Sequence, residues 1–165
     1  MTADKATSIA VAVDGSASGW EAMRRAINMA RLLKLPLDVL HVIQLRKSGY
    51  FAFIDRHLQE DQEVHAKKVL AEAVQRAEKI GVEAHTHLLE GEKDPSGAII
   101  DFLEKVRGVK FLVLGAHGLG FVGRHLLGST TERVVREVAR KALPVPVLIV
   151  PSTQLEEEPE PSKEK

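Results

Sequence analysis

The stretch from Phe111 to Thr131, FLVLGAHGLGFVGRHLLGSTT, decides the expected fold. It opens with four apolar residues, which is typical of a buried parallel strand, and the ERVVREVARKA that follows has a helical pattern. Between strand and helix stand Gly115, Gly118 and, after nine further residues, Gly128. Glycines at the carboxyl end of a strand permit left-handed backbone and leave no Cβ between main-chain amides and a ligand.

Two hydroxyl residues, Ser129 and Thr130, follow the last of these glycines and stand where the helix should have its N-cap. A helix N-terminus combines unpaired N–H groups with the positive end of the helix dipole, and both favour a phosphate. The stretch therefore predicts a phosphate site between a strand and a helix.

Two general nucleotide motifs compete for this stretch. Residues 118–123 spell GxGxxG, but the dinucleotide fingerprint leads directly into a long helix and has an acidic residue at the end of the next strand. Here Gly128 interrupts such a helix, and the nearest acidic candidates, Glu132 and Glu137, lie inside a helical pattern. A Walker A motif from Gly123 to Thr130 would have a lysine where this chain has Ser129, so it fits less well. A glycine-rich turn that only connects strand to helix is a further alternative.

The spacing Gly115-xx-Gly118-(nine residues)-Gly128-Ser129 resembles the nucleotide-binding signature of the universal stress protein family, G-2x-G-9x-G-[ST]. The resemblance extends to VAVDGS, residues 11–16, and to PVLIV, residues 146–150. It covers most of the chain from residue 8 to residue 151.

The resemblance implies an ATP site, with Mg²⁺ as a possible companion of the nucleotide. Residues matching Asp14 and the main chain of Val42 would contact the adenosine part. Those matching Gly115, Gly118, Gly128, Ser129, Thr130 and Thr131 would hold ribose and phosphates, and Ala12, His117 and Leu119 would line the same loops. Many members have a basic or polar residue after the second glycine, where this chain has the apolar Leu119. No Arg or Lys is fixed near the phosphates by the sequence, although Arg124 lies within the loop.

Composition places limits on other classes of function. The 165 residues suit one domain, and the 23 basic and 23 acidic side chains give no net basic field for nucleic acid. Cysteine is absent, which excludes disulfides and thiolate metal sites. No apolar run reaches a membrane span and the N-terminus lacks a signal-peptide core, so we expect a cytoplasmic protein.

Strand and helix patterns alternate along the chain, which predicts an α/β fold: a single doubly wound domain with five parallel strands and helices on both faces. Expected strands are 9–13, 37–44, 82–89, 111–114 and 147–150, and expected helices are 19–34 after a capping box at Ser18, 56–80 ended by Gly81, one opened by Asp94-Pro95, and 130–141. Apolar strands 1 and 4 should be central and the alternating strand 3 an edge, which gives the order 3-2-1-4-5 that the resemblance also implies. Asp14 and Gly115 then meet where the winding reverses, the position at which such sheets bind ligands.

Further expectations concern the limits of the domain, an aromatic loop and two pairs of histidines. The domain should span residues 6–151, and the acidic, proline-containing residues 152–165 should be disordered. Tyr50, Phe51 and Phe53 fall in an expected loop, 46–55, that either packs on the core or a subunit contact or covers a ligand. The histidine pairs His57/His65 and His85/His87 have tolerable metal spacing, but solvated side chains are the favoured interpretation.

The expected function is that of an ATP-binding stress-response or regulatory protein that works as a nucleotide-dependent module. The alternatives are a slow Mg²⁺-dependent ATPase or phosphoryl or adenylyl transferase with Asp14 on the metal, and a nucleotide-free dimeric scaffold. We expect a homodimer, because strand 5, Val147–Val150, is apolar yet lies at a sheet edge, where unpaired amides invite association. The resemblance implies the same contact.

Overall fold

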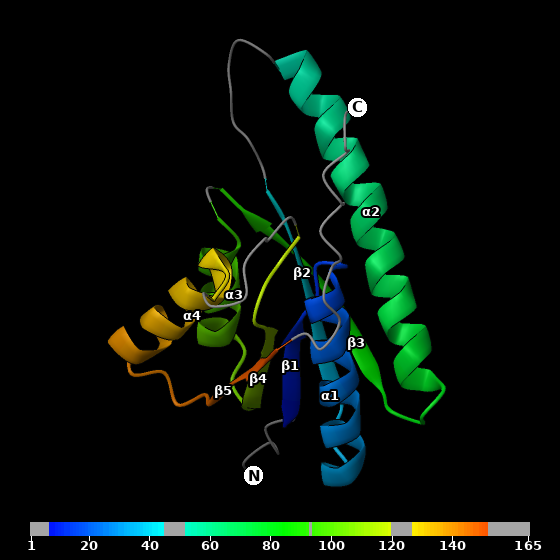
Figure 1. Cartoon of the computed structure of the whole chain (residues 1–165), viewed down its shortest axis with the longest axis vertical. Helices are drawn as coiled ribbons and strands as arrows, with labels where there is room; N and C mark the ends of the chain where they lie inside the picture. Colours follow the sequence, from blue (N-terminus) through cyan, green and yellow to red (C-terminus); the bar gives the residue numbers. More distant parts are fainter. Residues whose placement is uncertain (1–6, 45–51, 93, 120–126, 152–165) are drawn as a thin grey trace, which may run out of the picture.

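The computed structural model describes residues 7–44, 52–92, 94–119 and 127–151. Five parallel strands form one sheet: β1 (Ser8–Ala12), β2 (Leu37–Gln44), β3 (Ala84–Gly91), β4 (Val109–Gly115) and β5 (Val147–Val150). Their order is β3-β2-β1-β4-β5, so the predicted topology is confirmed (Figure 1). The winding reverses between β1 and β4, whose carboxyl ends therefore border the crevice expected for a ligand.

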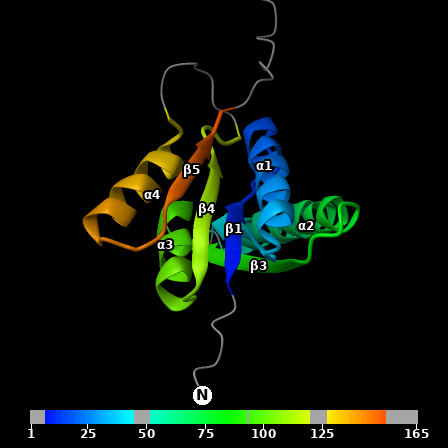
Figure 2. The same cartoon turned by 90° about the horizontal axis from the view of Figure 1, so that it is seen from below.

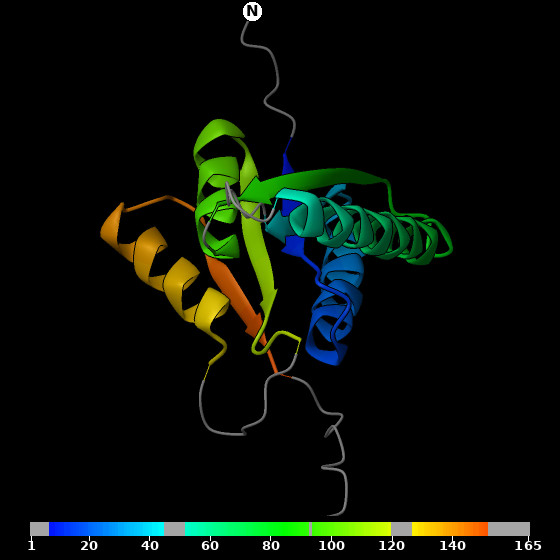
Figure 3. The same cartoon turned by 90° about the horizontal axis from the view of Figure 1, so that it is seen from above.

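Two pairs of helices cover the two faces of the sheet (Figures 2 and 3). The helices α1 (Ala17–Leu33) and α2 (Ala52–Glu78) lie on one face, and α3 (Pro95–Lys105) and α4 (Ser129–Arg140) lie on the other. Strand side chains alternate between the two cores: Ile9 and Val11 pack toward α1 and α2, whereas Ala10 packs with α3 and α4. β1 is buried on both sides, as its continuous apolar sequence predicted.

The starts of α1 and α2 differ from the sequence prediction. The N-cap of α1 is Ser16, whose hydroxyl accepts a hydrogen bond from the Gly19 amide at 3.0 Å, so the capping box predicted at Ser18 is wrong. Two serines stand two residues apart, and the Asp14 turn presents the first of them to the helix. Helix α2 begins at Ala52, earlier than the predicted residue 56, so residues 52–55 of the expected aromatic loop are helical. The rest of that loop, 46–51, and the expected tail, 152–165, lie outside the described residues.

The edge strand β3 is half exposed, as predicted, but its two histidines have different surroundings. His85 is exposed and pairs with Glu83. His87 is not simply solvated, because its Nε2 lies 2.8 Å from Asp38 Oδ1 and its ring packs edge-on against Phe102. The sequence shows only that the two rings share a strand face, and the position of the cross-strand carboxylate depends on the register of β2 with β3.

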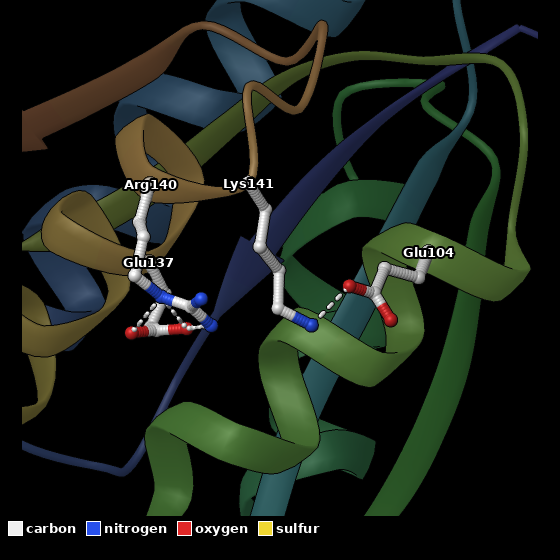
Figure 4. A network of polar contacts seen from close by, with 4 residues as sticks. All are labelled: Glu104, Glu137, Arg140 and Lys141. Carbon is white, nitrogen blue, oxygen red and sulfur yellow. Dashed lines mark hydrogen bonds and ion pairs between the residues drawn. The ribbon is translucent and has the colours of Figure 1, made fainter.

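Helices α3 and α4 run side by side and are joined near both ends. Their apolar faces share one core, which includes Ile99, Phe102 and Val134. At the ends remote from the carboxyl edge of the sheet, Lys141 forms an ion pair with Glu104, next to the Glu137–Arg140 pair within α4 (Figure 4). At the other ends, Arg133 of α4 pairs with Asp94, the N-cap of α3. Both helix starts therefore face the crevice from fixed positions.

Candidate functional site

A cleft of about 930 Å³ lies at the carboxyl edge of the sheet, over the ends of β1, β2 and β4. All eleven residues that the sequence nominated line it: Ala12, Asp14, Val42, Gly115, His117, Gly118, Leu119, Gly128, Ser129, Thr130 and Thr131. Small-molecule sites have about this size, roughly 300–1,000 Å³, and occur at the switch points of α/β sheets. The two separate sequence signals, near Asp14 and in the glycine stretch, thus meet in one cavity.

Asp14 joins the two sides of the switch point. Its Oδ1 accepts hydrogen bonds from the amide and the hydroxyl of Ser16, at 2.9 and 2.6 Å. Its Oδ2 accepts the amide of Leu119 at 3.1 Å, across the cleft floor. The turn that follows needs the left-handed region, because Gly15 has a φ of +91°. The carboxylate is therefore held in a fixed position between the end of β1 and the loop after β4.

The three motif glycines serve close packing, and left-handed backbone is not the reason for them. Positive φ among the described glycines occurs only at Gly15, Gly81 and Gly108, so the expectation of left-handed conformations in the motif is wrong. A Cβ added at Gly115 would lie 2.6 Å from Ser18 Oγ and 2.8 Å from Ser18 backbone atoms. One at Gly118 would lie 3.0 Å from Asp14 Oδ2.

Gly128, the third of these glycines, lies against the loop after β4, and a Cβ there would be 3.3 Å from the Ala116 carbonyl oxygen. Its own amide donates to that oxygen at 2.7 Å, which fixes the start of α4 against the end of β4. The motif therefore lets the turn after β1, the loop after β4 and the start of α4 pack closely against one another.

The N-terminus of α4 points into this cleft without a side-chain cap. Gly128 is the N-cap, so the prediction of a hydroxyl cap at Ser129 or Thr130 is wrong, and these are the first two helical residues. Gly128 leaves the following amides uncapped, and no hydroxyl bond is made by Ser129 or Thr130 within the described residues. Thr131 differs, because its buried hydroxyl donates to the Gly115 carbonyl at 2.8 Å. Two hydroxyls and the first amides of α4 are thus available to an anion.

The sequence did not predict the wall that α2 contributes. Leu58, Asp61, Gln62 and His65 of α2 line the cleft beside the end of β2. Gln62 Oε1 accepts the amide of Gln44 at 3.0 Å, which ties the wall to β2. An amphipathic pattern indicates a helix but not which of its turns lies over the sheet edge, so no sequence signal could have found these residues.

Two histidines, His41 and His65, contact main-chain carbonyl groups just after the end of β1. Nδ1 of the buried His41 lies 2.7 Å from the Val13 carbonyl oxygen, and Nε2 of His65 lies 3.2 Å from that of Asp14. The two rings meet edge-on at 5.8 Å. Burial lowers the pKa of His41 below its ordinary value of 6.5, against an opposing contribution from the hydrogen bond to Val13. The ring is therefore neutral at pH 7 and donates Nδ1–H to the carbonyl.

An ion pair between Arg133 and Asp94 lines the α3–α4 side of the cleft. Arg133 Nη1 lies 2.8 Å from Asp94 Oδ2, and the other oxygen of Asp94 accepts hydrogen bonds from the amide and hydroxyl of Ser96. Burial raises the pKa of Asp94, but these hydrogen bonds and the guanidinium outweigh it and hold the pKa below its ordinary value. The sequence predicts Asp94 only as the start of a helix. Arg133 could have been noticed, because it stands one helical turn after Thr130.

Two features are absent from the described residues, 7–44, 52–92, 94–119 and 127–151. No group of three or more His, Asp or Glu side chains there is arranged to hold a metal ion. None of the helices in those ranges is both long enough and apolar enough to cross a membrane.

The fold and the cleft define a class of protein, the single-domain doubly wound α/β proteins with a glycine-lined crevice between β1 and β4. The model of the universal stress protein family matches residues 6–151, and the chain belongs to this family. A universal stress protein of Methanocaldococcus jannaschii is 32% identical over 148 residues, which are 86% of this chain and 80% of that protein.

Solved structures of the family have the same fold. The universal stress protein UspA from Lactobacillus plantarum superposes with a TM-score of 0.76 at 24% identity, covering 90% of this chain and 99% of that one. The universal stress protein from Archaeoglobus fulgidus was solved in complex with dAMP. It superposes with a TM-score of 0.62 at 27% identity, covering 87% of this chain and 97% of that one.

Proposed function

We propose that this protein binds an adenine nucleotide, ATP, in the cleft and acts as a nucleotide-dependent regulatory module in a stress response. The observation that carries the proposal is the convergence of Asp14, the three motif glycines and the uncapped start of α4 on one cavity. Carboxylate, backbone amides and hydroxyls are the groups that ribose and phosphates require. The dAMP complex of the Archaeoglobus fulgidus relative supports an adenine nucleotide as the ligand.

The geometry favours a division of roles along the cleft. The adenosine part lies by the end of β2, with the main chain of Val42 and the carboxylate of Asp14 as its partners. The ribose and phosphates follow the loop of Gly115, Gly118 and Gly128 to the hydroxyls of Ser129 and Thr130. Thr131 contributes its amide, because its hydroxyl is already bonded to Gly115. Any Mg²⁺ that accompanies the nucleotide would be held mainly by its phosphates and by water, since this ion retains water and binds through few protein ligands.

A second copy of the chain is part of the proposal. β5 is a four-residue edge strand, and the exposed fractions of Leu148 and Ile149 are 39% and 36%. An apolar edge with unpaired amides invites pairing with another strand. Antiparallel pairing of Val147–Val150 with the same strand of a twofold-related copy would cover it with one self-complementary contact.

The proposal is tested first on the purified protein. Denaturation followed by anion exchange of the released small molecules identifies any nucleotide acquired from the cell. The stripped protein is then titrated with ATP, AMP, GTP and NAD. We expect ATP binding that Gly118→Val abolishes, because its added atoms collide with Asp14, and that Gly97→Val preserves, because a Cβ at Gly97 meets nothing within 4 Å.

Ser129→Ala measures the contribution of one hydroxyl. A charge-assisted hydrogen bond to phosphate is worth about 1.5–3 kcal/mol, so its loss should weaken ATP roughly tenfold to a hundredfold. Tighter binding of NAD than of ATP would revive the GxGxxG interpretation. No binding of any of the four at millimolar concentration would leave the nucleotide-free scaffold as the better explanation.

A further inference from the structure

Arg133 is the one arginine or lysine among the cleft-lining residues of the described chain. Its side chain is 57% exposed and ends at Asp94, on the rim of the cleft that belongs to α3. The motif alone places no Arg or Lys beside the expected phosphates, so the position of this guanidinium bears directly on what the cleft can hold.

Arg133 is placed to reach the start of its own helix. It follows Thr130 by three residues, so the two side chains share one face of α4. Side chains on a helix lean toward its N-terminus, which directs the long arginine side chain back over the first turn. The uncapped amides and the Thr130 hydroxyl lie at that turn, within the same cleft.

The fold does not depend on the bond between Arg133 and Asp94. The shared apolar core, with Phe102 and Val134, and the Glu104–Lys141 pair at the far ends hold α3 against α4 (Figure 4). Asp94 retains both hydrogen bonds from Ser96 if the arginine leaves, so α3 retains its cap. An exposed ion pair contributes little free energy, whereas a guanidinium binds a phosphate through two parallel, charge-assisted bonds.

We propose that Arg133 exchanges partners when the cleft fills, leaving Asp94 for the phosphate chain of the nucleotide, and that this exchange makes the protein prefer nucleotides with several phosphates. The inference rests on the proposed nucleotide function and assigns a specificity residue to it. In the empty cleft the arginine neutralises Asp94. In the filled cleft the phosphates take the arginine, and their negative charge increases with their number.

The test is a set of titrations of the full-length, stripped protein with ATP, AMP and adenosine. Arg133→Gln should weaken ATP roughly tenfold to a hundredfold through the loss of charge-assisted bonds to phosphate, weaken AMP less and leave adenosine unchanged. Lys141→Gln is the matched control, because it breaks the other ion pair between α3 and α4, and all three affinities should stay at wild-type values. A merely structural arginine would change the three ligands equally, and that result would overturn the assignment.

Asp94→Asn tests whether Arg133 leaves Asp94 for the phosphates or needs Asp94 to hold it in place. Asparagine still accepts the Ser96 amide as an N-cap, but it releases Arg133 and removes a negative charge from the cleft. We expect ATP to bind at wild-type strength or more tightly. Weakening as large as that of Arg133→Gln would mean that the pair acts as a unit, and the exchange would be wrong.

The two levels of the proposal fail in different ways. Wild-type protein that binds none of the three ligands contradicts the nucleotide function itself. Wild-type protein that binds ATP, together with an Arg133→Gln variant that binds ATP equally well, contradicts only the role of Arg133.

Discussion

The carboxylate of Asp14 accepts a hydrogen bond from the amide of Leu119 at 3.1 Å, although the two residues are far apart in the chain. This bond joins the turn after β1 to the loop after β4 across the point where the sheet changes its direction of winding. The two sides of the site are therefore linked by a hydrogen bond within the protein before any ligand binds. Asp14 has a structural role in addition to the ligand contact proposed for it.

Asp14→Ala should lower the stability of the nucleotide-free protein. The change removes the acceptor of three hydrogen bonds, from the Ser16 amide and hydroxyl and from the Leu119 amide. Bonds to a charged group contribute about 1.5–3 kcal/mol each, less where they are exposed, so we expect a loss of about 1.5 kcal/mol or more. Urea unfolding measures it, with Asp101→Ala, on the exposed side of α3, as the control. Equal midpoints for the two variants would contradict the role of these bonds.

Alanine at the motif glycines should destabilise in the order of the clearances. At Gly115 the new Cβ would lie 2.6–2.8 Å from Ser18, including its backbone, and we expect about 1–3 kcal/mol of destabilisation from overpacking. At Gly128, with its nearest contact at 3.3 Å, the loss should be smaller. Gly97→Ala, in open space within α3, should stabilise by up to about 1 kcal/mol. Thermal unfolding that ranked Gly128→Ala as worse than Gly115→Ala would refute this geometry.

Stability should decrease as the pH falls below 6.5, in part through His41. Burial lowers the pKa of this ring in the folded state, so just below 6.5 the unfolded chain binds a proton that the folded chain does not. Stability therefore increases with pH in that window, and the loss stops once the pH passes the folded pKa. His41→Asn, which removes the titration, should show a shallower decline in urea unfolding between pH 7 and pH 5. His85→Asn, on the exposed edge strand, should behave like the wild type, and identical slopes for all three proteins would exclude His41 as the cause.

Sedimentation equilibrium should give twice the chain mass of 18.1 kDa at micromolar concentration. Leu148→Lys places a charge on the exposed edge strand and should shift the equilibrium to monomer. Leu32→Lys changes a leucine of α1 whose exposed fraction is 76%, and it should leave the dimer intact. A wild-type monomer, or a dimer that survives Leu148→Lys, would contradict pairing through β5.

Much of the architecture was predictable because it depends on local, repeated patterns. Apolar runs fixed β1 and β4 as central strands, and alternation identified β3 as an edge. All eleven residues predicted for the site line one cleft, because the carboxyl ends of parallel strands meet at the same edge of the sheet. Whether those residues bind a nucleotide remains the prediction that the titrations address.

The features that the sequence could not supply depend on how elements dock. Gln62 reaches the amide of Gln44 because α2 packs against β2. The N-cap of α4 is Gly128 because its amide is held by the Ala116 carbonyl, and the hydroxyl residues at the next two positions gave no sign of this. The predicted left-handed conformation of the motif glycines was also wrong. The sequence alone cannot distinguish a glycine required for its backbone angles from one required for its lack of a Cβ.

Neighbouring atoms lie so close to Gly115, Gly118 and Gly128 that a mutation at these positions can change the packing around the cleft in only one way. Alanine scanning, which works by deleting atoms, cannot reveal a surface made by atoms that are already missing. Every replacement of these glycines adds atoms next to Ser18, Asp14 or Ala116, so random variation can only crowd this packing and cannot relieve it. A survey of tolerated variants should therefore find few or no substitutions at these three glycines.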